Sequence, residues 1–328
     1  MGRTMYLARA ARWAAVGITI LSAFPASAQD WPTKPIRIIS PYAAGGVGDT
    51  LFRLISPAVE TRLGQRFIIE NKTGAAGNIG TSDVVRADPD GYTFIFAPTA
   101  NFAVNQFLFK NLGFDPVTQL EPVTAMAEAP LIAIVSSGVT ATSLKELAEQ
   151  VRKDTTKFNY ASPGAGSPTH LAGASFSRQT SDAISHISYR GTPPMVQGLL
   201  ANDVQLAFPT LQPVDAQIKA GKLRALAVMG SQRLPQLSNV PTTIEAGFPE
   251  LIFGNWWVLA APKKTDPRII QRLSEEFHTA LADPAIRARL ADLGHVALDL
   301  GPKESKDFIR AEAERYKTLI NSTGITLE

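Results

Sequence analysis

Short apolar runs alternate with amphipathic helical patterns along most of this chain, and no other feature constrains the fold as strongly. From the N-terminal side, the predicted order is strand 36–40, helix 49–63, strand 67–69, helix 79–87 and strand 92–96. Strands that alternate with helices favour a parallel sheet covered by helices. Because the alternation returns further along the chain, the sequence predicts two α/β units.

The second unit and the C-terminal segment follow the same rule. The predicted strands lie at 131–135, 159–161, 185–189, 204–208, 225–228 and 256–260, and the predicted helices at 143–152, 168–179, 193–200, 267–282 and 302–320. No internal repeat and no low-complexity linker interrupts this pattern. We therefore expect ordered strands to cross between the units and form a hinge, with ligand space where the strand ends of the two sheets face each other.

Residues 1–28 have the organisation of a bacterial secretory signal. Three arginines and no acidic residue accompany an apolar run at 13–24, which is too short to span a bilayer as a helix. Small residues at 26–28 predict cleavage between Ala28 and Gln29. An uncleaved N-terminal anchor is the alternative, whereas lipid anchoring is excluded because the chain has no cysteine. We expect a periplasmic protein.

Charge and composition narrow the classes of function. Three of the 32 Lys and Arg residues (Arg3, Arg9 and Arg12) leave with the signal, so 29 remain to match the 29 acidic residues. A neutral chain without blocks of like charge offers no footprint for nucleic acid or for an anionic membrane. Four scattered histidines and no cysteine argue against a metal site, and no Walker A motif is present. We expect no cofactor.

The loop at 41–49 is the most informative candidate for a binding site. Gly45, Gly46 and Gly48 let the backbone approach a ligand closely. The loop opens the predicted helix at 49–63, whose free N–H groups and dipole favour an anion. Asp49 is placed to cap this helix and to organise water. A glycine-rich turn that serves packing alone is the alternative.

Three further loops repeat this design at 73–80, 162–170 and 189–193, each between a predicted strand and a predicted helix. The last of them carries Arg190, a fixed positive charge. Four small, amide-rich loops with one arginine indicate capture of a small anion such as a carboxylate.

A serine hydrolase is the competing interpretation. Ser162, Ser167 and His170 lie close in sequence, and a Ser/His/Asp site can be assembled in any chain order. The nucleophile-elbow motif G-x-S-x-G is absent, however, and Pro168 after Ser167 fits the start of a helix better than a strained nucleophile turn. We therefore expect no catalytic residues.

Taken in order, these loops resemble the Bug (TctC-like) extracytoplasmic solute receptors of tripartite tricarboxylate transporters. The resemblance runs from residue 31 to the C-terminal helix. It is carried by Pro41-Tyr42…Gly45-Gly46…Asp49, residues 70–80, residues 87–93, Tyr160-Ala161-Ser162…Gly166-Ser167…His170, Tyr189-Arg190-Gly191-Thr192, residues 220–228 and residues 240–249.

The resemblance implies a periplasmic-binding-protein-like (Venus flytrap) fold with a ligand cleft between two α/β domains. Domain 1 would combine residues 29–130 and 252–328, and domain 2 would comprise residues 131–251, with crossing strands near 131–135 and 252–259. The ligand-binding residues it implies are Tyr42, Ala44, Gly45, Gly46, Asp49, Thr73, Gly74, Thr99, Ser162, Gly166, Ser167 and Thr192, beside Arg190.

The expected partners follow from the same resemblance. A small organic carboxylate, either a mono- or a dicarboxylate, would be bound by a monomer and passed to the membrane subunits of a secondary transporter. An extracytoplasmic sensor that signals through a partner protein uses the same fold and stays open as an alternative.

Overall fold

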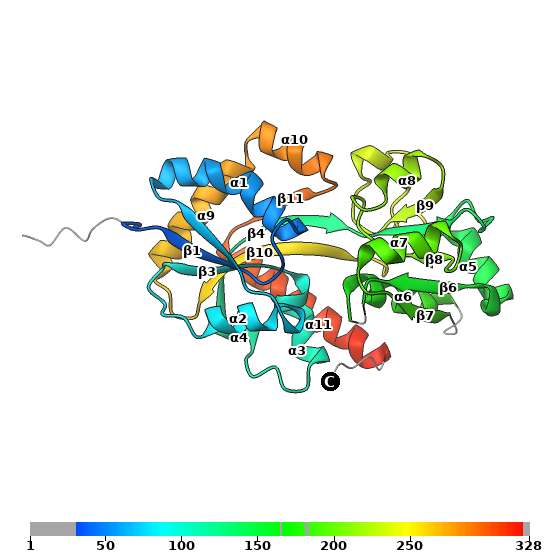
Figure 1. The fold of residues 1–328 in the computed structure, drawn as a ribbon, viewed down its shortest axis with the longest axis horizontal. Helices are drawn as coiled ribbons and strands as arrows, with labels where there is room; N and C mark the ends of the chain where they lie inside the picture. Colours follow the sequence, from blue (N-terminus) through cyan, green and yellow to red (C-terminus); the bar gives the residue numbers. More distant parts are fainter. Residues whose placement is uncertain (1–30, 165, 181–183, 324–328) are drawn as a thin grey trace, which may run out of the picture.

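A computed structural model of the chain describes residues 31–164, 166–180 and 184–323, and shows two lobes joined by extended strands (Figure 1). The first lobe is built on a six-stranded sheet of order β11-β4-β10-β3-β1-β2, and the second on a five-stranded sheet of order β7-β6-β8-β5-β9. The predicted α/β architecture is confirmed. The predicted signal and its cleavage site lie outside the described residues.

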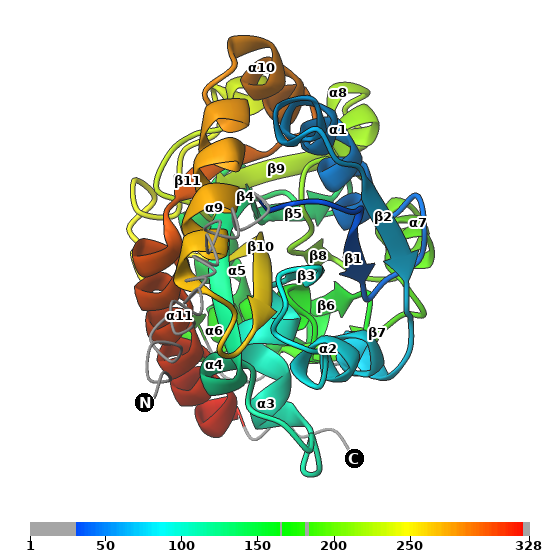
Figure 2. The same ribbon diagram turned by 90° about the vertical axis from the view of Figure 1, so that its left-hand side faces the viewer.

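The parallel part of the first sheet follows the predicted βαβαβ order. Ile38 of the central strand β1 is opposite both Ile69 of β2 and Phe94 of β3, in parallel register. Helices α1 and α9 pack on one face of the sheet, and α2 and α11 pack on the other (Figure 2). The bounds are Ile36–Ser40 for β1, Val47–Leu63 for α1, Phe67–Asn71 for β2, Asn78–Val85 for α2, Thr93–Pro98 for β3, Pro267–Leu281 for α9 and Pro302–Thr323 for α11.

The other part of the first sheet is antiparallel and was largely missed by the sequence prediction. Strand β10 (Gly254–Pro262) pairs with β3 on one side and with β4 (Leu120–Pro130) on the other. Neither β4 nor β11 (Val296–Leu300) was predicted, and the same holds for helix α10 (Pro284–Asp292). A π-helical turn (Ala100–Val104) and two short helices, α3 (Asn105–Leu108) and α4 (Pro116–Gln119), complete this lobe.

The second sheet is mixed. Strand β6 pairs in parallel with β7 and β8, whereas β5 is antiparallel to β8 and β9. The bounds are Ile132–Ser136 for β5, Leu144–Lys153 for α5, Asn159–Ser162 for β6, Pro168–Thr180 for α6, Ser185–Ser188 for β7, Thr192–Leu200 for α7, Leu206–Ala207 for β8, Asp215–Lys219 for α8 and Leu223–Val228 for β9.

Three backbone segments meet where the chain passes between the sheets. Leu131, directly after β4, donates its N–H to the carbonyl of Phe253 at 2.8 Å, and its own carbonyl accepts from Met229 at 2.8 Å. Phe253 donates to Met229 at 2.9 Å and closes the set. The strands of the first sheet come from 36–130 and 254–300, and those of the second from 132–228. This segregation supports the expected domain bounds, which stay a prediction.

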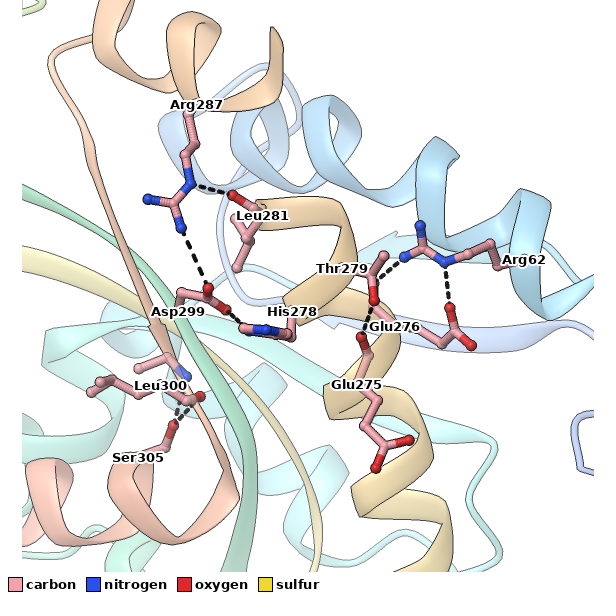
Figure 3. Close-up of polar contacts among 11 residues, drawn as sticks. Arg62, Glu275, Glu276, His278, Thr279, Leu281, Arg287, Asp299, Leu300 and Ser305 are labelled. Atoms are coloured by element: carbon pink, nitrogen blue, oxygen red, sulfur yellow. Dashed lines mark hydrogen bonds and ion pairs between the residues drawn. The ribbon is translucent and has the colours of Figure 1, made fainter. Parts of the chain in front are cut away.

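Side-chain contacts fix the C-terminal elements to each other and to α1 (Figure 3). His278 of α9 and Arg287 of α10 both contact the carboxylate of Asp299 in β11, at 3.0 and 3.4 Å. Arg62 of α1 forms an ion pair with Glu276 of α9 and also donates to its backbone carbonyl. The C-terminal elements α9, α10 and β11 are thereby attached to α1 of the first lobe. Within the described ranges, no helix is both long enough and apolar enough to cross a bilayer.

Candidate functional site

A cavity of about 850 Å³ lies between the two lobes. Its walls are the loops that follow β1, β3, β6 and β7, the turn that precedes α2, and the first half of β10. Strand ends in open α/β sheets are the usual place for ligand sites. The lining residues are Ser40, Tyr42, Ala43, Gly46, Val47, Gly48, Asp49, Ala76, Phe96, Pro98, Ala100, Asn105, Leu108, Pro163, Gly166, Ser167, Pro168, Gly191, Thr192, Asn255 and Trp257.

Three helices begin at this cavity. The N-cap of α1 is Gly46 and the N-cap of α7 is Gly191, and neither residue has a side chain that could cap the first turn. Ser167 precedes α6 and lines the same cavity. The first amides of a helix lack intrahelical acceptors and carry the positive end of its dipole. Three such ends converging on one space favour an anionic group.

Asp49 organises the first of these helix ends. Its Oδ2 accepts hydrogen bonds from the backbone N–H of Gly45 and from Nε of Arg53, both at 3.0 Å. The Arg53 guanidinium, assisted by the Gly45 amide, holds the pKa of Asp49 below its ordinary value against the opposing effect of burial. Asp49 is 5% exposed, and its Oδ1 has no hydrogen-bond partner among the described residues. A buried, ionised carboxylate thus holds the first loop at the cavity wall.

A polar network attaches this loop to the turn before α2. The Tyr42 hydroxyl lies 3.1 Å from both the carbonyl of Ala76 and Oδ1 of Asn101, and burial of this end raises the pKa of the phenol. The same carbonyl accepts from Nδ2 of Asn105 at 3.0 Å. Ala75 and Ala76 have positive φ values of 47° and 52°. Left-handed alanines are strained, and such strain gathers at functional sites.

The second lobe contributes two loops that are hydrogen-bonded to each other. Gly191 donates its N–H to the carbonyl of Pro163 at 3.0 Å, and Tyr189 donates to Ser162 at 2.9 Å. Gly191 has φ 103°, a conformation that favours glycine. Below them, the Ser162 hydroxyl lies 2.7 Å from Nε2 of His186. These contacts hold the start of α6 and the start of α7 side by side.

The serine hydrolase interpretation is not supported by the geometry of Ser167 and His170. The Ser167 hydroxyl donates to the carbonyl of Gly164 at 2.7 Å and accepts from the backbone N–H of His170 at 3.2 Å, so it acts as a helix cap. The ring of His170 is occupied with another contact, because its Nδ1 accepts from the N–H of Gly166 at 3.0 Å. Burial and the neighbouring His186 lower the pKa of His170 to about 4.

The structure brings six of the predicted site residues together on the cavity wall: Tyr42, Gly46, Asp49, Gly166, Ser167 and Thr192. The other seven lie off that wall. Gly45 does not line the cavity, but its N–H donates to Asp49, which does. Ala44 is exposed next to Gly45, and Thr73 and Gly74 are exposed in the neighbouring turn.

The remaining three of those seven residues do not line the cavity either. Thr99 is fully buried, and its Oγ1 accepts from the backbone N–H of Trp256 at 2.9 Å. Ser162 is also fully buried and pairs with His186. The Arg190 side chain is exposed and does not line the cavity. These three roles as ligand contacts stay predictions.

Sequence reasoning missed the wall that comes from β10. Trp257 and Asn255 line the cavity, while Trp256, between them, faces the core of the first lobe. The indole of Trp257 packs on Gly48, where an added Cβ would lie 3.1 Å from the indole nitrogen. Two adjacent tryptophans in a predicted strand were the available signal, because neighbours in a strand point to opposite faces.

No group of three or more His, Asp or Glu side chains that could hold a metal occurs in the part of the chain that the structure describes. The polar groups of the cavity are backbone amides, hydroxyls, side-chain amides and the Asp49 carboxylate.

Comparison with known proteins gives one consistent result. The model of the tripartite tricarboxylate transporter family receptor (TctC) matches residues 51–325. Protein BugT of Bordetella pertussis is 32% identical over 319 residues, which is 96% of this chain and 98% of BugT.

Solved structures agree with it. The periplasmic binding protein BugD is 31% identical with a TM-score of 0.75, covering 91% of this chain and 100% of that one. Rpa4515 of R. palustris, solved with adipate, is 31% identical with a TM-score of 0.79, covering 90% and 99%. MatC from Rhodopseudomonas palustris, with bound malate, is 28% identical with a TM-score of 0.74, covering 88% and 99%. The predicted resemblance is thus confirmed: the chain belongs to the tripartite tricarboxylate transporter receptor (TctC) family, whose Bug-type members are solute-binding receptors and not enzymes.

Proposed function

We propose that this protein captures a small carboxylate in the periplasm and delivers it to the membrane subunits of a tripartite tricarboxylate-type transporter. The convergence of the N-termini of α1, α6 and α7 on one cavity is the observation that carries the proposal. Fixed amide dipoles can hold a carboxylate without a cationic side chain. The adipate and malate found in two relatives support the same class of ligand.

The periplasmic location rests on residues 1–28. An arginine-containing start, a short apolar run and small residues before Gln29 form a cleavable signal, with cleavage after Ala28. N-terminal sequencing of the protein from a periplasmic extract is expected to begin at Gln29. Recovery of the full-length chain in the membrane fraction would instead indicate an uncleaved anchor.

Ligand binding is proposed to favour a closed arrangement of the lobes. Val47 and Trp257 line the cavity from the first lobe, and Pro163 and Thr192 line it from the second. A ligand that contacts both walls binds the closed form better and shifts the population toward it. Small-angle scattering with and without ligand measures this closure as a decrease in the radius of gyration.

Screening a carboxylate library by thermal shift, followed by calorimetry, tests the ligand class. We expect at least one carboxylate to bind with a Kd of about 1 μM or tighter. The matched amide of that carboxylate is the control, and it should bind far more weakly because the helix N-termini recognise negative charge. A broad library without a single hit would refute the proposal.

Transport is distinguished from sensing by the membrane partner. We expect the protein to be a monomer in analytical ultracentrifugation. We also expect the ligand-loaded protein to support uptake of the ligand into vesicles that contain the transporter subunits encoded in the same genome. Vesicles that take up the ligand equally well without the receptor would favour a sensor that signals through a partner protein.

A further inference from the structure

Arg315, on the C-terminal helix α11, reaches the segment that crosses between the lobes and leads into β10. Its Nη1 donates to the carbonyl of Ile252 at 3.1 Å. Its Nε and Nη2 donate to the carboxylate of Glu312, three residues earlier on α11, at 2.8 and 2.9 Å. The guanidinium also lies 5.0 Å from the ring centroid of Phe253. A planar guanidinium with several directed hydrogen bonds is held in one orientation, so the Ile252 carbonyl is held on the first lobe.

The peptide that joins Ile252 to Phe253 is held by both lobes. Its carbonyl accepts from Arg315 of the first lobe, whereas its N–H donates to the carbonyl of Met229, directly after β9 of the second sheet, at 2.9 Å. A single hydrogen bond permits some rotation, because the donor direction at a carbonyl oxygen is broadly distributed. The lobes can therefore turn relative to each other at this peptide without losing either contact.

The preceding carbonyl, that of Leu251, is held by the second lobe. It accepts from the hydroxyl of Thr243 at 2.8 Å, and the N–H of Thr243 donates to Val228 of β9 at 2.8 Å. Successive carbonyls at Leu251 and Ile252 are thus attached to different lobes. Because peptide bonds are planar, φ and ψ of Ile252 are the two soft torsions between these carbonyls. A change in the angle between the lobes is concentrated there.

Beyond this point the chain is fixed on the first lobe and soon forms part of the cavity wall. Trp256 donates its Nε1 to Glu312 at 3.1 Å and its backbone N–H to Oγ1 of Thr99 at 2.9 Å. Asn255 and Trp257, on either side of Trp256, line the ligand cavity. Movement of the backbone on this side of Ile252 would therefore displace the wall, whereas movement at Ile252 itself would not.

A second cavity, of about 730 Å³, lies beside Arg315 where helix α11 of the first lobe meets helix α6 of the second (Figure 1). Arg315 and Phe253 line it together with Ser175 and Arg178 of α6. The other end of α6 begins after Ser167, at the ligand cavity. A turn of the second lobe moves α6 at both cavities, and the space beside Arg315 leaves room for this movement.

We infer that Ile252 is the pivot of the crossing segment, and that Arg315 is a positioning residue for the ligand cavity. Arg315 keeps the Ile252 carbonyl on the first lobe, so the lobes turn at Ile252 and the wall formed by Asn255 and Trp257 stays in place. Without Arg315, the turn spreads over residues 252–256 and reaches that wall. This role rests on the lobe movement of the proposed function and is independent of the identity of the ligand.

Distances between the lobes of the empty mature protein test this role. The chain has no cysteine, so Ala288→Cys on α10 and Glu149→Cys on α5 place two exposed nitroxide labels on different lobes. Arg315→Lys keeps a positive charge beside Glu312 but cannot bond this carboxylate twice and reach Ile252 as well. We expect the distance distribution from double electron–electron resonance to be at least about 1.5-fold broader in Arg315→Lys than in the native sequence.

Arg62→Lys is the matched control. Arg62 also bonds a carboxylate and a backbone carbonyl, both of them in Glu276, but all of these groups lie within the first lobe. This substitution should leave the distance distribution unchanged. Equal broadening in Arg62→Lys and Arg315→Lys would overturn the role of Arg315, and so would an unchanged distribution in Arg315→Lys.

A pair of variants at Thr243 tests the pivot from the side of the second lobe. Thr243→Val removes the hydroxyl that bonds the carbonyl of Leu251, and Thr243→Ser keeps a hydroxyl. We expect a broader distribution in Thr243→Val and the native one in Thr243→Ser. The same distribution in both variants would show that the pivot is not confined to Ile252.

Hydrogen exchange tests whether the cavity wall is affected. In Arg315→Lys, the amides of residues 252–258 should exchange at least about fivefold faster, whereas those of β1 should keep their native rates. Thermal unfolding checks that the variant is folded. Native exchange rates at 252–258 would overturn the link between Arg315 and the wall. Because both measurements use the empty protein, such a failure would leave the proposed capture of a carboxylate intact.

Discussion

Nδ1 of His170 accepts a hydrogen bond from the backbone N–H of Gly166 at 3.0 Å. Gly166 lines the cavity, and the ring of His170 stacks on His186 with 3.8 Å between centroids. Burial, together with the neighbouring His186, keeps the pKa of His170 at about 4, so the ring is neutral at physiological pH. A proton on Nδ1 would convert the acceptor into a donor and break the contact with Gly166.

His170 is therefore expected to make the protein acid-sensitive. The unfolded chain takes up a proton near pH 6.5 and the folded chain only near pH 4, so the stabilisation is complete above pH 6.5 and is lost as the pH falls toward 4. His170→Asn retains an acceptor without this titration. The loss in unfolding free energy between pH 7 and pH 4.5 should shrink by about 1–3 kcal/mol in this variant, as measured by chemical denaturation.

His278→Asn is the control for that experiment, because His278 is exposed, does not line the cavity and lies beside Asp299. This substitution leaves the contact between His170 and Gly166 in place. If His170→Asn and the native protein show the same profile, the contact with Gly166 does not depend on the protonation of His170.

Asp49→Ala should weaken carboxylate binding about tenfold or more. The substitution removes the acceptor for the Gly45 amide and for Arg53, so the first loop loses its internal attachment. This loss outweighs the relief of charge repulsion, because Arg53 already balances much of the Asp49 charge. Calorimetry measures the effect, with Asp307→Ala as an exposed control that breaks only a surface pair with Lys303. Unchanged affinity in Asp49→Ala would disprove this role.

Glu128, near the end of β4, is expected to destabilise the folded protein at alkaline pH. Burial, reinforced by the negative charge of Glu312, raises its pKa to about 7, with Arg315 acting in the opposite direction. Its protonated form is thus the one that folding favours, and this stability is complete below pH 4.5 and lost as the pH rises through 7. Glu128→Gln should raise the unfolding free energy at pH 8 by about 1–3 kcal/mol and change little at pH 4.5.

Glu121, on the same strand, is a control in which the same type of substitution should change stability in the opposite direction. Although burial opposes it, the ammonium groups of Lys306 and Lys263 lower the pKa of Glu121. Glu121→Gln should therefore lower stability at pH 8. A gain at pH 8 in both variants would mean that lost negative charge, and not the surroundings of Glu128, is the cause.

Gly173→Ala in α6 and Gly198→Ala in α7 should differ in effect. In each case the added Cβ would overlap a tyrosine, Tyr160 for Gly173 and Tyr189 for Gly198. Tyr160 is buried and its ring lies against His186, with 5.0 Å between centroids, whereas Tyr189 is only half-buried and meets the Cβ with its hydroxyl end. We expect Gly173→Ala to cost about 2–4 kcal/mol and Gly198→Ala about 1 kcal/mol or less, measured by urea denaturation. Equal losses of stability would contradict the expectation that Tyr189 can move away from the added Cβ and Tyr160 cannot.

Local patterns predicted much of the fold because each parallel strand and its helix carry their own signals. Helix α6 was expected at 168–179 and spans Pro168–Thr180, and β1 spans the expected Ile36–Ser40. Strand β4 was missed because it is buried on both faces and contains Pro122 and Pro130, so neither polar alternation nor β propensity marks it. Helix α10 buries only Ile286 and Leu290, too few for a periodic pattern.

The site was predictable where loops open helices. The glycine-rich turns predicted that Gly46, Gly166 and Thr192 lie together, and all three line the cavity, since strand ends and helix starts meet at one edge of a sheet. Trp257 could not be assigned in that way, because β10 reaches the cavity through a pairing between residues that lie far apart in the chain. The contact of Thr99 with Trp256 depends on the same pairing.

The position of β10 also sets an order for folding. β3 and β4 are not paired directly, because β10 lies between them and is bonded to both. All strands of the second sheet precede β10 in the chain, since β9 ends at Val228 and β10 begins at Gly254. As the chain is made from its N-terminus, the second lobe can therefore complete its sheet before β10 is present. Until β10 is present, β4 lacks both of its partner strands and β3 keeps one unpaired edge, so this is the interval in which exposed strand edges make the first lobe most prone to aggregation.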